Sequence, residues 1–156
     1  MLKLLSSGLV VFAGVACAPS PVSPLQFSQV LEARQDARLG AVRGFFEKAG
    51  CPAREYAQAF LDAADGNRLD WRLLPSISFV ESTGGKTAPN NNIFGWDNGR
   101  SSFSSPTAAI WGVAYQLGQS KLYRDRNLNQ VLALYNPDPG YASKVKSVMR
   151  QIAVLE

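Results

Sequence analysis

The chain has 156 residues, a formal net charge of +4, two cysteines and no histidine, and 46% of its residues are hydrophobic. This apolar content is typical of a globular domain, and the missing histidine excludes a Ser-His-Asp triad, a Cys-His pair and a His-Glu-x-x-His zinc site. Two cysteines cannot supply the four ligands of a structural zinc site. Any catalysis must therefore rest on carboxylates, hydroxyls, lysines or backbone groups, and we expect neither a metal nor a cofactor.

Residues 1–18 have the features of a secretory signal peptide. A basic start at Lys3 is followed by an apolar stretch over residues 4–16. This stretch is too short to span a bilayer, because a spanning helix needs about 20 residues. A short apolar stretch that ends in small residues is typical of a secretory signal. We therefore expect export to the periplasm or cell envelope.

Cys17 lies in two overlapping patterns. The run Gly-Val-Ala-Cys over residues 14–17 resembles a bacterial lipobox, in which Cys17 would become the lipidated N-terminus, whereas Ala-Cys-Ala over 16–18 is a cleavage pattern of freely secreted proteins. Residues 19–34 begin with a proline-rich run, which predicts an extended tether. A lipid on Cys17 would be the only link to a membrane. If Cys17 stays free, a disulfide with Cys51 is the alternative.

Helical periodicity dominates residues 35–156, which we expect to form one domain and a monomer. Apolar residues recur three and four positions apart, and proline or a polar residue stands at several helix starts. Glycines at 50 and 84–85 predict helix ends. The pattern predicts a mainly α fold with five or six helices, over residues 36–49, 52–64, 71–82, from 106 onward, 127–135 and 141–154.

The segment from Lys86 to Ser105 differs from the rest, because it is polar and rich in Asn, Gly and Ser. Asn98-Gly99 stands between the runs 93–97 and 100–103, and Asn-Gly in such a position is a strong signal for a tight hairpin. We therefore predict one small β-hairpin here. The remainder of the segment is a candidate functional loop.

Glu81 is the first candidate for chemistry. It follows Ile77 by four residues and Leu74 by seven, so the three side chains share one face of the predicted helix. Partial burial, together with a place in the last helical turn, would raise the pKa of its carboxyl group. A carboxylic acid that stays protonated near neutral pH is what a glycosidic general acid requires. The alternative is an exposed glutamate in a frayed helix end.

Three motifs resemble those of lysozyme-like peptidoglycan hydrolases. Residues 69–86, which contain Glu81-Ser82-Thr83-Gly84, resemble the catalytic helix of these enzymes, which ends in Glu-Ser-x-Gly. The run Asn-Asn-Ile-Phe-Gly over residues 91–95 resembles the Asn-Asn-Leu-Phe-Gly element of the glucosaminidases of glycoside hydrolase family 73. Residues 135–145 resemble the late Tyr-Ala-Thr-Asp-Pro-x-Tyr-Ala-x-Lys-Ile motif of that family. The motifs occur in the family's order and together cover about residues 65–150.

The resemblance implies a mainly α (α+β lysozyme-like) fold with a cleft, and peptidoglycan glycan strands as the partner. It implies cleavage of β-1,4 bonds between N-acetylhexosamines, with Glu81 as general acid and either Tyr135 or Tyr141 near the scissile bond. Trp96 would stack on a sugar ring or, alternatively, pack on the body of the domain. The expected cleft floor consists of Asn91, Asn92, Phe94 and Gly95, although the asparagines also fit a simple turn.

The chain departs from the family between Glu81 and Pro106. The family usually has a longer β-lobe here, which carries a second acidic residue, whereas this segment is short and its only acidic residue is Asp97. Asp97 would serve as the base that activates water, or it is only a turn residue. Without a second carboxylate, the substrate's own acetamido group can assist hydrolysis, or a lytic transglycosylase can act with Glu81 alone. A non-catalytic wall-binding lipoprotein is a further alternative. A nucleic-acid binder is not expected, because no predicted face carries a cluster of Lys and Arg.

Overall fold

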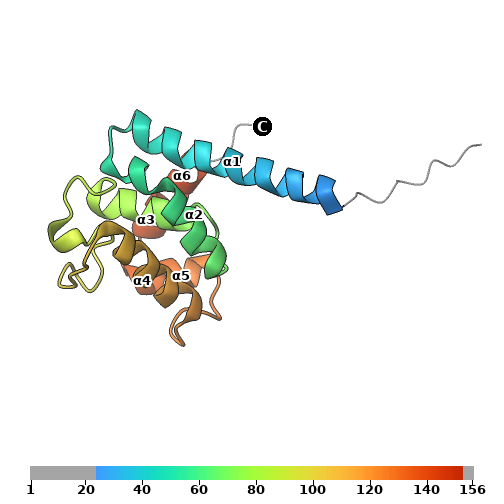
Figure 1. Cartoon of the computed structure of the whole chain (residues 1–156). Helices are drawn as coiled ribbons and strands as arrows, with labels where there is room; N and C mark the ends of the chain where they lie inside the picture. The colour runs from blue at the N-terminus through green and yellow to red at the C-terminus, as the bar shows by residue number, and fades with distance from the viewer. Residues whose placement is uncertain (1–23, 153–156) are drawn as a thin grey trace, which may run out of the picture.

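The computed structural model describes residues 24–152, except for the side chains of residue 24 and residues 26–36 (Figure 1). The predicted signal peptide over 1–18, Cys17 and the start of the predicted tether lie outside the described residues, as do residues 153–156. None of the described helices is both long and apolar enough to cross a membrane.

The described chain is mainly helical, as the sequence predicts, and within it no strand forms. Six α-helices and two short 3₁₀ helices follow one another. They are α1 (Pro24–Lys48), η1 (Pro52–Tyr56), α2 (Ala57–Gly66), α3 (Leu73–Ser82), η2 (Pro89–Asn91), α4 (Pro106–Gln119), α5 (Leu128–Tyr135) and α6 (Tyr141–Gln151).

The main difference in helix bounds concerns α1, which begins at Pro24 rather than at residue 36. Residues 24–34, which we predicted to form the end of the tether, are therefore helical. Proline is favourable at the first position of a helix, and the residues that follow include strong helix formers such as Leu, Gln, Glu, Ala and Arg.

The helix starts and ends follow local chemistry. The Ser105 hydroxyl accepts a hydrogen bond from the backbone N–H of Ala108, which caps α4. Asn127 and Gln130 form a reciprocal capping box at the start of α5. At the end of α3, Thr83 adopts a left-handed conformation with φ of 51°, and the N–H of Gly84 returns to the carbonyl of Ser78.

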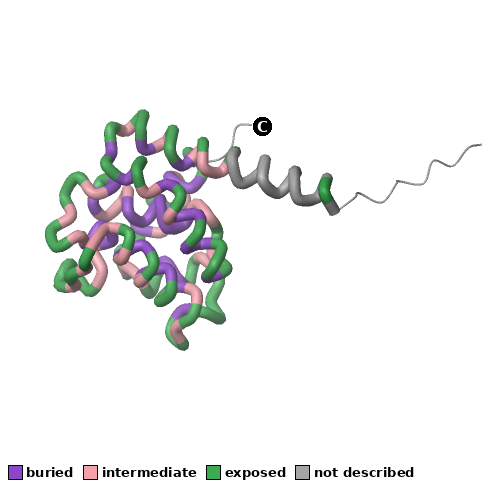
Figure 2. Tube along the Cα trace, in the orientation of Figure 1, coloured by how far each residue is buried: buried purple, intermediate pink, exposed green. Residues whose placement is uncertain are grey.

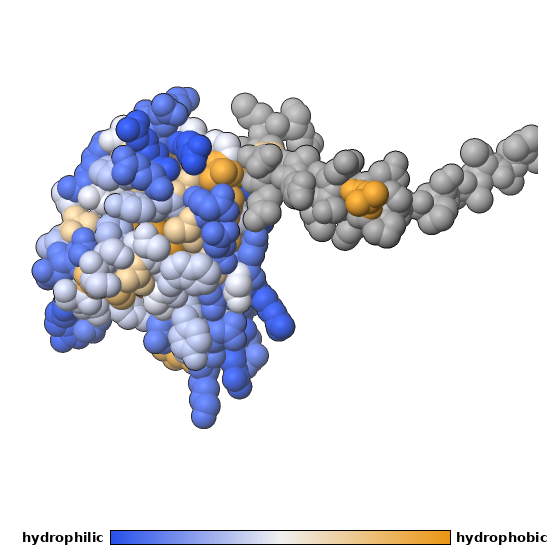
Figure 3. All heavy atoms as spheres, viewed as in Figure 1, coloured by the Kyte–Doolittle hydropathy of each residue, from blue (hydrophilic) through white to orange (hydrophobic). Residues whose placement is uncertain are grey.

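Helix α3 lies at the centre of the molecule, and its residues 73–78 are all buried (Figure 2). It packs against α6 on one side and α2 on another. The rings of Phe46, Phe60 and Phe94 run through the core, with centroids 5.8 and 6.3 Å apart along the series. Figure 3 shows that the surface around this core is mostly hydrophilic on the face in view. The buried position of α3 holds its last turn, which carries Glu81, in a fixed place.

The predicted β-hairpin is not seen within residues 24–152; residues 93–94 and 96–100 form turns instead. Asp97, Asn98 and Gly99 all have positive φ angles, of 54°, 52° and 78°. The backbone bonds around these residues are local, from the N–H of Gly99 to the carbonyls of Gly95 and Trp96 and from that of Arg100 to Asp97, while the N–H of Phe103 bonds to the carbonyl of Asn90. A tight two-residue hairpin turn has two residues with positive φ, whereas here three in a row have it, and the chain coils without a paired ladder.

Candidate active site

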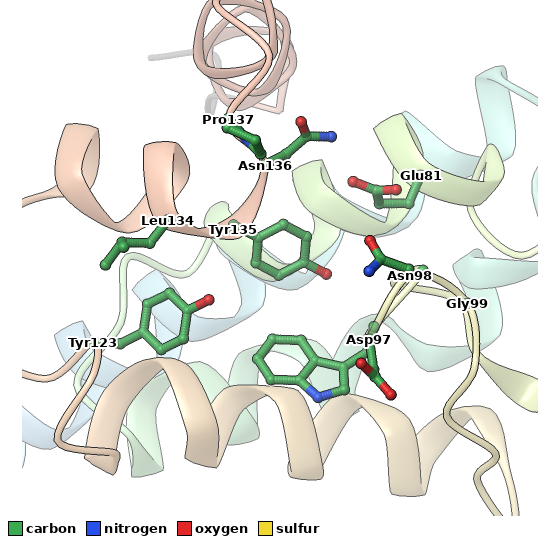
Figure 4. A pocket seen from close by; sticks show the side chains of 11 residues that line it. Glu81, Asp97, Asn98, Gly99, Tyr123, Leu134, Tyr135, Asn136 and Pro137 are labelled. Atoms are coloured by element: carbon green, nitrogen blue, oxygen red, sulfur yellow. The ribbon is translucent and has the colours of Figure 1, made fainter.

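A cavity of about 670 Å³ opens at the end of α3 (Figure 4). Its walls come from three separate segments: Glu81 on α3, the loop over residues 95–99, and the end of α5 with the turn that follows it, residues 134–137. Tyr123 completes the lining. Figure 4 shows Glu81 and Asn98 at one end of the cavity and Tyr123 at the other.

Glu81 lines this cavity from the last turn of α3 and is half-buried. Burial raises the pKa of its carboxyl group, and the nearby Tyr141 hydroxyl offsets part of that rise. The predicted direction of the pKa shift is therefore confirmed, with burial as its main cause. The group is accessible to a ligand while part of its hydration is removed.

Gly95 fits closely against the carboxylate of Glu81. A Cβ atom at this position would lie 2.8 Å from Oε2 of Glu81, which is closer than real Cβ contacts come. Gly95 also has a φ of +58°, a backbone conformation that residues other than glycine adopt only at a cost in free energy. The predicted cleft-floor residue thus sets how near the loop comes to the acid, and it lines the cavity.

Tyr135 and Tyr141 lie together as a stacked pair, with ring centroids 5.9 Å apart and planes 6° from parallel. The Tyr135 hydroxyl donates a hydrogen bond of 2.6 Å to the carbonyl of Phe94. The Tyr141 hydroxyl is buried and has no hydrogen-bond partner among the described residues. Burial raises the pKa of both phenols. Tyr135 lines the cavity, whereas Tyr141 lies behind it and affects Glu81.

Trp96 packs on the body of the domain, which is one of the two alternatives that the sequence left open, and it also lines the cavity. Its ring packs against the body of the domain, with its centroid 5.6 Å from that of Tyr135 and 6.3 Å from that of Tyr123. It is only partly buried and lines the cavity. The three aromatic rings therefore form one apolar wall, held in place by their mutual contacts.

Asn91 and Asn92 do not line the cavity, and their amides are used inside the protein. The Asn91 side chain donates to the carbonyl of Phe103 at 2.9 Å. Asn92 is buried, donates to the carbonyls of Trp96 and Ser101, and accepts from the N–H of Trp96. These contacts fit the alternative in which the asparagines form a turn, and not a cleft floor. Both asparagines hold the loop that carries Gly95 and Trp96.

Phe94 is fully buried, so its ring supports the cavity from behind, and it does not form part of the lining. Its ring contacts Phe60 in the core, and its carbonyl oxygen accepts the hydrogen bond from Tyr135. Phe94 therefore links the loop to α5 through a backbone contact.

Asp97 lies at the rim of the cavity, and half of its side chain is exposed. Its carboxylate forms an ion pair with Arg100, with an N–O distance of 2.6 Å. In Figure 4 this carboxylate points away from Glu81. The structure brings Asp97 to the cavity but does not place its carboxylate opposite that of Glu81.

Six cavity residues are missing from the set predicted from sequence: Asn98, Gly99, Tyr123, Leu134, Asn136 and Pro137. The amides of Asn98 and Asn136 lie at the same end as Glu81 in Figure 4. Asn136 and Pro137 belong to the third motif, directly after Tyr135, so their place in that motif was an available signal. Tyr123 stands in an irregular segment, and only the fold brings it to the site.

Among the side chains that the structure describes, no group of three or more Cys, Asp or Glu residues lies close enough together to hold a metal ion. Comparisons of the chain with protein-family models, with curated proteins and with solved structures find no match. The geometry of the cavity is therefore the basis for assigning a function.

Proposed function

We propose that this protein is a lysozyme-like peptidoglycan glycosidase of the endo-β-N-acetylglucosaminidase type, with Glu81 as its general acid. The observation that carries the proposal is a half-buried carboxyl group of raised pKa at one end of a cavity lined by aromatic rings and amides. A perturbed carboxyl in a concave site is a candidate for proton transfer. The protein would meet its substrate in the cell envelope, reached through the signal at residues 1–18.

The cavity suits a chain of N-acetylated sugars. The ring faces of Trp96 and Tyr135 offer apolar surface to the C–H faces of pyranose rings, and rigid aromatic contacts of this kind stabilise bound ligands. The side-chain amides of Asn98 and Asn136 can exchange hydrogen bonds with hydroxyl and acetamido groups. These groups are neutral, as the binding of an uncharged glycan backbone requires.

In the proposed reaction, protonated Glu81 donates its proton to the glycosidic oxygen while the bond from that oxygen to C1 breaks. The acetamido oxygen of the same sugar attacks C1 and forms a cyclic intermediate. Water then adds to C1, its proton returns to the Glu81 carboxylate, and the ring reopens to the free sugar. This route fits a site in which Arg100 holds the second acidic side chain, Asp97, at the rim.

Lytic transglycosylation is the second candidate, and the same position of Asp97 favours it. Here the Glu81 carboxylate, after donating its proton, takes a proton from a hydroxyl of the cleaved sugar, and that oxygen closes an anhydro ring on C1. One acid/base group performs both proton transfers. The two candidates differ in their products, because hydrolysis leaves reducing ends and transglycosylation leaves anhydro ends.

Turbidity of a peptidoglycan suspension tests whether the protein cleaves walls in a Glu81-dependent way. We expect the exported form to clear the suspension, and Glu81→Gln to reduce the rate by about 100-fold or more, since general acids contribute roughly 10²–10⁴-fold. Glu55→Gln, at an exposed position on η1, is the matched control and should stay active. If all three proteins bind walls from several bacteria but none clears them, the non-catalytic wall-binding alternative holds and the enzyme proposal is wrong.

A further inference from the structure

A second cavity, of about 280 Å³, shares one lining residue with the first. Tyr123 lines both cavities. Figure 4 places Tyr123 at the end of the first cavity opposite Glu81, so the residue that the two cavities share lies at that end. Its walls come from residues 67–69 between α2 and α3, residues 117–119 at the end of α4, and residues 123–126.

The second cavity is closely packed at Gly118 and Asn67, and charged residues also line it. Gly118 lies so close to Asn67 that an added Cβ would overlap the Asn67 backbone oxygen, and the Asn67 side chain is tied to the carbonyl of Ala63. Figure 3 shows hydrophilic side chains gathered at the lower end of the molecule, over the segment that follows α4. The charged residues that line the cavity are Arg68, Arg124, Asp125 and Arg126.

Two of these three arginines are not neutralised within the described part of the chain. Arg124 is paired with Asp125, with an N–O distance of 3.2 Å. Arg126 donates from Nε to the carbonyl of Leu122, which fixes its guanidinium and leaves its terminal nitrogens free for other acceptors. Neither Arg68 nor Arg126 has a carboxylate within ion-pair distance among the described residues. The cavity therefore has an excess of positive charge.

We propose that this arginine-lined cavity binds the carboxylates of the peptide stems carried by peptidoglycan glycan strands. The inference rests on the proposed function and deepens it, because it names the part of the substrate that a neutral sugar site cannot recognise. Guanidinium groups bind carboxylates in a two-point geometry and are exposed here to a passing strand. A strand that has its scissile bond at Glu81 and extends past Tyr123 would bring a stem next to Arg68 and Arg126.

Binding measurements on the full chain carrying Glu81→Gln test this inference without any need for turnover. The probes are soluble glycan strands with intact peptide stems and the same strands after amidase removal of the stems. We expect the intact strands to bind more tightly. The double change Arg68→Gln and Arg126→Gln should weaken that binding by about fivefold or more, because each exposed charge contact contributes modestly, and should leave binding of stem-free strands unchanged.

Arg54→Gln, at an exposed site on η1, is the matched control and should bind both probes as the parent does. Arg68→Lys with Arg126→Lys should keep part of the preference, which separates charge from geometry. Circular dichroism checks that each variant is folded. If the double variant is not folded, the two single variants are measured in its place.

Equal binding of intact and stem-free strands would overturn the inference, as would an equal loss on both probes in the double variant. A phosphate-rich wall polymer that binds through the two arginines in preference to the stems would also overturn it. None of these results would affect Glu81-dependent wall clearance, and a failure of clearance would not by itself remove a stem-dependent difference in binding.

Discussion

The carboxyl group of Glu81 is half-buried, and burial raises its pKa above that of an ordinary glutamate. The folded protein therefore holds this proton more tightly than the unfolded chain does. Between the unfolded and the folded pKa the native state binds more protons, so stability falls as pH rises through that range. The property that suits Glu81 to donate a proton thus destabilises the fold at neutral pH.

Replacing Glu81 with Gln should stabilise the protein at neutral pH, because a neutral amide of similar shape has no charge to desolvate. At about pH 3.5, below the ordinary glutamate pKa of about 4.3, both side chains are neutral and the difference should vanish. Thermal unfolding at the two pH values measures this, with Glu55→Gln as the exposed control. A melting temperature for Glu81→Gln that is unchanged or lower at neutral pH would contradict the burial argument.

A methyl group at position 95 should displace the Glu81 carboxylate, because the new Cβ would lie 2.8 Å from Oε2. Misplacement of a catalytic group by about 1 Å can cost roughly 100-fold in rate, so we expect Gly95→Ala to lose about that much wall-clearing activity. Both this change and its control, Gly99→Ala, place a side chain at a positive φ, which costs about 1–2 kcal/mol.

Gly99 is the matched control because it has a φ of +78° in the same loop but no atom within 4 Å of the added Cβ. The two variants should therefore lose similar stability while only Gly95→Ala loses most of its activity. Equal activity in the two variants would show that the contact with Glu81 is unimportant.

At the scale of residues, the sequence indicated that Glu81 and Gly95 belong to the site, because each is part of a local motif. The lining by Asn98 and Leu134 was not predicted, because it depends on contacts between segments far apart in the chain. Asp97 lines the cavity, but its carboxylate is paired with Arg100. This ion pair depends on the left-handed turn between the two residues, which the Asn-Gly pattern alone did not define.

At the scale of elements, Ser82 joins the end of α3 to the loop that carries Gly95. Its hydroxyl lies 2.8 Å from the carbonyl oxygen of Ile93 and 3.0 Å from that of Ser78, and it accepts from the N–H of Gly85. The last turn of α3 and the loop are therefore coupled through one buried side chain. This contact fixes the distance between Glu81 and the opposite wall of the cavity.

Ser82→Ala should destabilise the protein by about 1–3 kcal/mol, because the change leaves buried backbone groups without a partner. Ser76 is the matched control: it lies on the same helix, is fully buried, and its hydroxyl has no partner among the described residues. Ser76→Ala should be neutral or stabilising. Denaturant unfolding of both variants measures the difference, and equal losses would refute the anchoring role of Ser82.

The helices were predictable because their apolar residues repeat at helical spacing and because capping residues stand at their starts. The conformation around Asn98-Gly99 was not predictable in the same way. This pair signals a tight turn, but it does not define whether the flanking residues pair as strands. In the structure the side chain of Asn92 bonds to the carbonyls of Trp96 and Ser101, and so replaces the cross-strand bonds that a hairpin would need. Asn92, six residues before Asn98, therefore helps to hold the turn in its form.

At the scale of the whole molecule, the first cavity exists because α3 is central and ends where two other segments meet it. Burial of residues 73–78 fixes α3, the loop over 95–99 covers its end, and the turn after α5 closes the third side. In the proposed reaction no histidine is needed, because the fold itself shifts the pKa of a carboxyl group. The second cavity extends this surface with positive charge.

Mass spectrometry of the glycan products is the measurement that tests the central claim most directly. Purified peptidoglycan treated with the protein should release fragments with new chain ends: reducing ends if the acetamido-assisted route operates and anhydro ends if transglycosylation does. Glu81→Gln should release neither, while Glu55→Gln should match the parent. Intact glycan strands after treatment with a folded, wall-binding parent protein, or the same new ends from Glu81→Gln, would contradict the claim that Glu81 cleaves the glycosidic bond.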